Sequence, residues 1–135
     1  MVACLVRRFN TNDPMIIAQS LGIYIFYQPL GKIIGMYKYM QKSRVIIINS
    51  DIQDDVIRRV VLSHELGHAV LHPKENCCFM GHYTLLLTSK IERQANLFAA
   101  HLLITDDILN DYIGYTKDQF CNCTGYPKEL LDLRI

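Results

Sequence analysis

The sequence predicts an α+β fold, in which a small antiparallel three-stranded sheet packs against two longer helices and short C-terminal helices follow. Two observations carry this prediction. Between residues 23 and 49, stretches rich in Ile, Tyr and Val are separated by turn residues, as strands are. Beyond residue 51, apolar residues recur at the three- and four-residue spacing of helices.

The first predicted element is a short helix that ends at Ser20. Asp13 can accept a backbone N–H as its N-cap, Pro14 suits the first helical position, and Gly22 ends the helix. Three strands follow at residues 23–28, 32–39 and 44–49, separated by residues 29–31 and 41–43. Because connections this short favour neighbouring strands in opposite directions, we expect an antiparallel meander.

The rest of the chain is predicted to be helical apart from one connection. Ser50 and Asp51 begin a helix that contains the apolar run 56–71, and a second helix covers residues 89–103. Between these helices, residues 73–88 are predicted to be irregular and long enough to be functional. Thr105 caps a short helix, and two more short helices are separated by residues 125–127.

Length and composition indicate one compact domain. A chain of 135 residues, 50% of them apolar, can bury a sizeable core, so we expect residues 1–135 to form a single domain. No apolar run approaches the roughly 18 residues needed to cross a membrane. The apolar stretch at the start of the sequence is too short for a signal peptide. We therefore expect a cytoplasmic location. The net charge is +1 with scattered basic residues, so we expect no direct nucleic-acid binding.

The five cysteines do not form a pattern typical of disulfides. Their number is odd, and neither the adjacent pair 77–78 nor the pair 121 and 123 has the spacing of a zinc ribbon. Free thiols in a reducing compartment are the expected state, and a second, structural zinc is the minor alternative.

The most informative segment is the H-E-x-x-H motif at residues 64–68, inside the apolar run. Residues four apart on a helix lie on one face, so His64 and His68 can bind a single metal ion. Glu65 projects beside them, where it can reach a metal-bound water. This set is what a zinc hydrolase needs. The alternative, a helix with two satisfied histidines and a surface glutamate, is disfavoured because the neighbouring residues are core-like.

A third ligand must come from outside the motif, and His72 is the nearest histidine. It lies eight residues beyond His64, about 12 Å along a helix, which zinc–nitrogen bonds of about 2 Å cannot bridge. We expect His72 to end the helix and not to be a ligand.

Glu92 is the better candidate for the third ligand. A second helix packed on the first can present it to the metal, and Asn96, one turn later, can orient a ligand. The alternative is a capping box, in which Ser89 and Glu92 satisfy the backbone at the start of the helix. The spacing alone leaves both roles open.

Residues 64–72 (HELGHAVLH) and 92–100 (ERQANLFAA) together resemble the ImmA/IrrE family of zinc-dependent endopeptidases, often carried by phages and integrative elements. The resemblance covers most of the chain. It implies a zincin-like, gluzincin-type domain with one catalytic Zn²⁺ held by His64, His68 and Glu92, and Glu65 as the catalytic base. It also implies a protein substrate, a helix-turn-helix transcriptional repressor. Members usually have an acidic residue where this chain has His101.

The mechanism implied by this ligand set is general-base hydrolysis. Glu65 takes a proton from the zinc-bound water as it attacks a peptide carbonyl, and then passes the proton to the leaving amine. An edge strand of the sheet could hold the substrate extended, and residues 73–88 could gate the cleft. Zincins usually add a His or Tyr that stabilises the oxyanion, and the candidates here are His82, Tyr83, His101 and Tyr37.

Two other functions fit a zinc site in this sequence. One is an adaptor that binds a repressor without cleaving it, which the intact Glu65 disfavours because a scaffold has no need of a base. The other is a hydrolase of small molecules, such as an amidase or a deaminase. The resemblance disfavours it, as does the absence of the Cys-rich ligand set of nucleotide deaminases.

Overall fold

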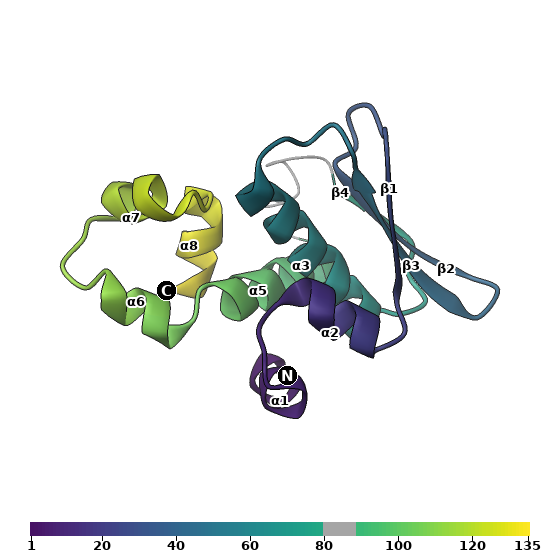
Figure 1. The fold of residues 1–135 in the computed structure, drawn as a ribbon, viewed down its shortest axis with the longest axis horizontal. Coiled ribbons are helices and arrows are strands. Elements are labelled where there is room, and N and C mark those ends of the chain that lie inside the picture. Colours follow the sequence, from purple (N-terminus) through teal and green to yellow (C-terminus); the bar gives the residue numbers. More distant parts are fainter. Residues whose placement is uncertain (80–88) are drawn as a thin grey trace.

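The computed structural model describes residues 1–79 and 89–135 (Figure 1). The sheet lies on one side of the helix that contains the H-E-x-x-H motif, a second long helix packs against that motif helix, and the C-terminal helices lie beyond it. The helices are α1 (Val2–Phe9), α2 (Pro14–Ser20), α3 (Asp55–Leu71), α5 (Lys90–Leu103), α6 (Asp106–Asp111), α7 (Lys117–Thr124) and α8 (Lys128–Arg134); the strands are β1 (Tyr24–Gln28), β2 (Gly35–Met40), β3 (Ser43–Asn49) and β4 (Cys77–Phe79).

The α+β class is confirmed, but the predicted three-stranded meander is wrong. Within the described residues, the sheet has four strands in the order β1-β3-β2-β4, and β1 runs parallel to β3. The β2–β3 hairpin closes through Gln41 and Lys42, whose φ angles of 48° and 63° fit a tight two-residue turn. This hairpin fixes β3 beside β2, and β1 therefore adds to the other edge of β3.

Asn49 explains how β1 and β2 can be separated by β3. Residues 29–34 pass over the end of β3, where the Asn49 side chain donates to the carbonyl oxygens of Gly31 (3.1 Å) and Ile33 (2.9 Å). The backbone N–H of Asn49 donates to the Ile34 carbonyl (3.0 Å). A single asparagine at a strand end therefore holds the crossing loop, and the hydrophobic pattern does not reveal such a contact.

The helices agree with the predictions in most places. Asp13 caps α2, Thr105 caps α6, and Gly125 ends α7 in the left-handed conformation. The motif helix begins later than predicted: Asp54 is its N-cap and accepts the N–H groups of Val56 and Ile57. Residues 50–53 instead form a turn after β3. No element was predicted at residues 2–9, where α1 lies, or at residues 77–79, where β4 interrupts the segment expected to be irregular.

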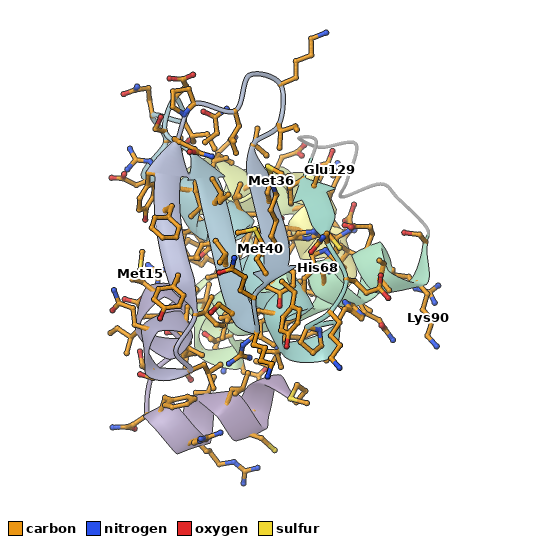
Figure 2. All side chains as sticks on the ribbon, turned by 90° about the vertical axis from the view of Figure 1, so that its right-hand side faces the viewer. Met15, Met36, Met40, His68, Lys90 and Glu129 are labelled. Carbon is orange, nitrogen blue, oxygen red and sulfur yellow. The ribbon has the colours of Figure 1, made fainter. Side chains whose placement is uncertain are left out.

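One continuous hydrophobic core joins the sheet to the helices. The inner sheet face contributes Tyr37, Ile46 and Ile48, and the core then runs through α3 and α5 to Leu130 and Leu131 of α8. The other face of the sheet faces the viewer in Figure 2, where Met36 and Met40 of β2 are labelled, and it carries no helix from the described part of the chain. Helix α3 is therefore enclosed between the sheet and α5, which buries the motif.

Two expectations from composition concern bilayers and thiols. Across residues 1–79 and 89–135, no helix combines the length and the apolar character that a bilayer crossing requires. All five cysteines are free thiols, and Cys77 is the buried one.

Candidate metal centre

Three of the residues singled out from the sequence converge between α3 and α5. Glu92 places one carboxylate oxygen 3.0 Å from His64 Nε2 and the other 3.2 Å from His68 Nε2. The two imidazole nitrogens are 3.1 Å apart. Donor atoms of all three residues lie within 4.8 Å of one another, and all three residues are buried.

These separations fit a small tetrahedral ion. Two ligand atoms at about 2.0–2.1 Å from a tetrahedral centre are roughly 3.3–3.4 Å apart. The observed separations of 3.0–3.2 Å need only a slight expansion to reach that value. Two imidazole nitrogens and a carboxylate oxygen are also the donor set of catalytic zinc sites, which leave a fourth position open. The residues present therefore fit a zinc ion.

The close approach of the two helices is what brings Glu92 to the histidines. Gly67, which lies between the two histidines in the sequence, faces α5. A Cβ on Gly67 would be 3.1 Å from the Phe98 Cβ and 3.2 Å from the Ala95 Cα. A larger residue would push α5 away and carry Glu92, one turn before Ala95, with it. The absence of a side chain at Gly67 thus allows the close approach of α5 that brings Glu92 to the two imidazoles.

The capping-box alternative for Glu92 is not formed. Ser89 is the N-cap of α5, but its side chain makes no capping hydrogen bond. The Glu92 side chain turns instead to the two imidazoles. The start of α5 therefore does not compete for the carboxylate.

Glu65 is fully buried, and its two carboxylate oxygens have no hydrogen-bonding partner among the described residues. The side chain lies against β2, where Gly35 leaves room: a Cβ on Gly35 would be 3.5 Å from the Glu65 Cγ and 3.6 Å from its Oε1. A carboxylate buried without partners is costly. The carboxylate lies beside a polar cluster that could hold a metal ion, where a base has a chemical use that it would not have in the hydrophobic core.

The two glutamates have pKa values displaced in opposite directions. Burial raises the pKa of Glu65 well above its usual value, and the nearby charge of Glu92 adds to this. Burial would also raise the pKa of Glu92, but hydrogen bonds with His64 and His68 hold it at about 2. Glu92 is thus ionised, as a metal ligand must be, whereas Glu65 has a stronger tendency to take a proton. Paired groups separated in this way are typical of acid–base sites.

Several side chains surround the two histidine rings, and of these the sequence predicted Asn96 but not Phe79 or Cys77. The His64 ring packs edge-on against Phe79 of β4, with ring centroids 4.5 Å apart. Burial lowers the pKa of His64, while Glu92 and Asn96 act in the opposite direction, which places Asn96 next to this ring as expected. His68 Nδ1 lies 3.2 Å from His72 Nδ1 and 3.6 Å from the Cys77 Sγ. Phe79 and Cys77 were missed because their strand is only three residues long.

Among the described residues, the other predicted candidates are not part of the His64, His68 and Glu92 cluster. Tyr37 is buried, but its hydroxyl donates to the Pro73 carbonyl (2.5 Å), and burial raises its pKa to about 12. His101 is exposed and lines a cavity between α1 and α5. His72 caps the end of α3, as expected, and is not part of the ligand cluster. His82 and Tyr83 lie outside the described residues.

Gly35→Ala should destabilise the protein by about 1–3 kcal/mol, the usual cost of overpacking. The added methyl would lie 2.5 Å from Val61 Cγ1, in the core between β2 and α3. Val61→Ala removes that atom, so the double variant should lose less stability than the sum of the two single variants. Denaturant unfolding of all four proteins measures this coupling, and additive losses would contradict the close contact.

Comparison with known proteins places this arrangement in a family. The family model described as the IrrE N-terminal-like domain matches residues 18–119, which include α3 and α5. Two relatives are similar along most of their length. "Uncharacterized immunity region protein 2" of Bacillus phage phi105 is 37% identical over 133 residues, covering 96% of this chain and 84% of that protein. "Metallopeptidase ImmA" of Bacillus subtilis (strain 168) is 31% identical over 140 residues, covering 99% of this chain and 81% of that protein.

The matched family and the geometry agree on the type of chemistry. The cluster of His64, His68 and Glu92 lies within the matched residues, and the Bacillus subtilis relative is named as a metallopeptidase. The chain belongs to the ImmA/IrrE family of metallopeptidases.

Proposed function

We propose that the chain is a zinc-dependent endopeptidase that cuts one regulatory protein, a helix-turn-helix transcriptional repressor of a phage or mobile element. The observation that carries this proposal is the convergence of His64, His68 and Glu92 beside the buried, unpartnered carboxylate of Glu65. The continuous core from the sheet to α8 supports one catalytic domain over residues 1–135.

In this proposal His64, His68 and Glu92 hold the metal through Nε2, Nε2 and a carboxylate oxygen. Zinc, when bound, lowers the pKa of a coordinated water and polarises the substrate carbonyl. The ionised Glu92 offsets part of the positive charge, because its pKa is held at about 2 by the two imidazoles. The neutral state of His64, whose pKa burial lowers, leaves a lone pair for the metal at neutral pH.

Glu65 is the general base. It accepts a proton from the attacking water and then delivers that proton to the nitrogen of the leaving amine. Its raised pKa suits this exchange, because a strongly acidic carboxyl would not retain the proton between the two steps. The absence of a side chain at Gly35 leaves the space that the Glu65 carboxylate occupies beside β2.

The substrate is proposed to bind along β4. This strand is one edge of the described sheet, pairing with β2 through Gly35↔Phe79 and Tyr37↔Cys77. Phe79 touches His64 and Cys77 lies near His68, so a peptide added beyond β4 would run along the metal site. Backbone pairing at an edge strand selects extended segments and tolerates many side chains. The scissile bond is therefore expected in an extended or locally unfolded segment of the partner.

A repressor is the proposed substrate because of the family and the charge pattern. One relative is named for a phage immunity region, and another is named as a metallopeptidase. The net charge of this chain is only +1, so operator binding is assigned to the partner and cleavage to this chain. An intracellular repressor implies that the enzyme works in the cytoplasm.

Incubation of the zinc-loaded protein with the repressor encoded next to it should give slow cleavage at one site. Mass spectrometry of the products identifies the bond, and a zinc chelator should abolish the reaction. Casein-like substrates measured in parallel should be cut much more slowly, since they lack the matching segment. Comparable rates on casein would contradict specificity. Tight binding of the repressor without any cleavage, with zinc bound, would establish the adaptor function instead.

A further inference from the structure

His68 has two ring nitrogens with different surroundings. Its Nε2 faces His64 and Glu92, and its Nδ1 faces away from them toward His72. A neutral imidazole can bind a metal only through the nitrogen that carries no hydrogen, so metal binding at Nε2 requires the hydrogen on Nδ1. That N–H then needs an acceptor inside a buried site.

His72 offers such an acceptor, because its Nδ1 lies 3.2 Å from His68 Nδ1. To accept there, His72 must carry its own hydrogen on Nε2. This second N–H has a partner as well: the Gln94 carboxamide places its Oε1 2.7 Å from His72 Nε2. An amide oxygen only accepts, so the chain Gln94–His72–His68 has one consistent direction, with the unprotonated Nε2 of His68 at its end.

The other neighbour of His68 Nδ1 cannot replace this chain. The Cys77 Sγ is 3.6 Å away, and it also lies 3.7 Å from the Glu75 carbonyl, which can accept its S–H. A thiol sulfur is a weak acceptor, and it imposes no particular tautomer on His68. Metal-binding histidines usually donate to a carboxylate, a carbonyl or water. In this protein the acceptor is the imidazole of His72, whose other nitrogen contacts the Gln94 carboxamide.

We propose that His72 and Gln94 are positioning residues that select the metal-binding tautomer of His68. Neither contacts the ion. This inference rests on the metal site of the proposed function. It assigns a role to His72, which lies too far along the helix from His64 to be a third ligand, and to Gln94 on the neighbouring helix. It also predicts that the polarity at position 94, more than its size, controls metal affinity.

Three substitutions at Gln94 separate polarity from packing. Gln94→Glu keeps an acceptor opposite His72, Gln94→Met removes it at similar length, and Gln94→Lys replaces it with a donor. Gln94 also lines a cavity of about 770 Å³ with Leu97 and Phe98, so a methionine there has apolar neighbours. Thermal unfolding of the metal-free proteins checks that all three variants fold.

Zinc affinity is measured by competition with a chelating indicator. We expect one zinc per chain throughout, with affinity lower by about 10- to 100-fold in Gln94→Met, which is the usual cost of losing an outer partner of a metal ligand. Gln94→Glu should bind within a few-fold of wild type, and Gln94→Lys should be the weakest because it reverses the chain. Nitrogen NMR of labelled histidine should show hydrogen on Nε2 of His72 and Nδ1 of His68 in the zinc-loaded wild type.

Two results would be decisive against the positioning role. Equal affinity of the Met, Lys and wild-type proteins would show that Gln94 does not act on the site, as would hydrogen on Nδ1 of His72 in the zinc-loaded protein. Failure of the wild type itself to bind zinc would instead remove the metal site, and with it the proposed function. The two failures are therefore distinguishable.

Discussion

Glu65→Gln should retain bound zinc and lose hydrolysis by about 10²-fold or more, the usual contribution of a general base. The amide has nearly the same shape, so it fits the space beside Gly35, but it cannot accept the proton of the attacking water. The measurement is single-turnover cleavage of the repressor, together with zinc content by elemental analysis. Turnover like that of the wild type, with zinc in place, would exclude Glu65 as the base.

The pH dependence of the free energy of unfolding of Glu65→Gln shows whether this variant folds. Burial raises the pKa of Glu65 in the folded protein above its ordinary value of 4.5. The folded state then holds this proton more tightly than the unfolded state, so wild-type stability falls as the pH rises from about 4.5 toward the raised pKa. Glutamine carries no charge, so the metal-free variant should be the more stable protein at neutral pH. Its advantage should disappear in acid.

Glu92→Ala should abolish or severely weaken zinc binding. The substitution removes the carboxylate from the proposed ligand set and leaves the two imidazoles. Zinc affinity should therefore fall by more than the loss of about 10- to 100-fold that removing an outer partner of a ligand causes. Zinc titration against a chelating indicator measures the loss, and cleavage of the repressor should stop with it.

Ser89→Ala is the matched control on the same helix. Since the Ser89 side chain makes no capping hydrogen bond, its removal should cost well under the typical 1 kcal/mol of a lost cap, with zinc affinity unchanged. Unchanged zinc content in Glu92→Ala would show that the third ligand is another residue.

The fold was predictable where local residues determine it. Asp13, Thr105 and Gly125 mark helix ends by their own side chains or backbone, and these boundaries hold. The strand order was not predictable, because it depends on Asn49 holding a loop that crosses the end of β3. Strand β4 has only three residues and forms by pairing with β2, so its sequence carries too little periodicity to identify it.

The candidate site divides in the same way. The spacing of His64 and His68 places two rings on one face, which follows from helix geometry alone. The choice between ligand and cap for Glu92 could not be made from its helix, since it depends on how closely α5 approaches Gly67. His72 was expected to end the helix, and it does, but its contact with Gln94 joins two helices and has no signal in either segment.

The candidate metal donors on α3 and α5 also predict that metal concentration affects how long the protein persists in a cell. Only the folded state brings His64, His68 and Glu92 together, so an ion bound there shifts the folding equilibrium by mass action. At a free metal-ion concentration one hundred times the dissociation constant, the free energy of unfolding rises by about 2.7 kcal/mol. Openings that expose the backbone to cellular proteases become correspondingly rarer. We therefore expect the abundance of the protein, as well as its activity, to follow the metal supply of the cell.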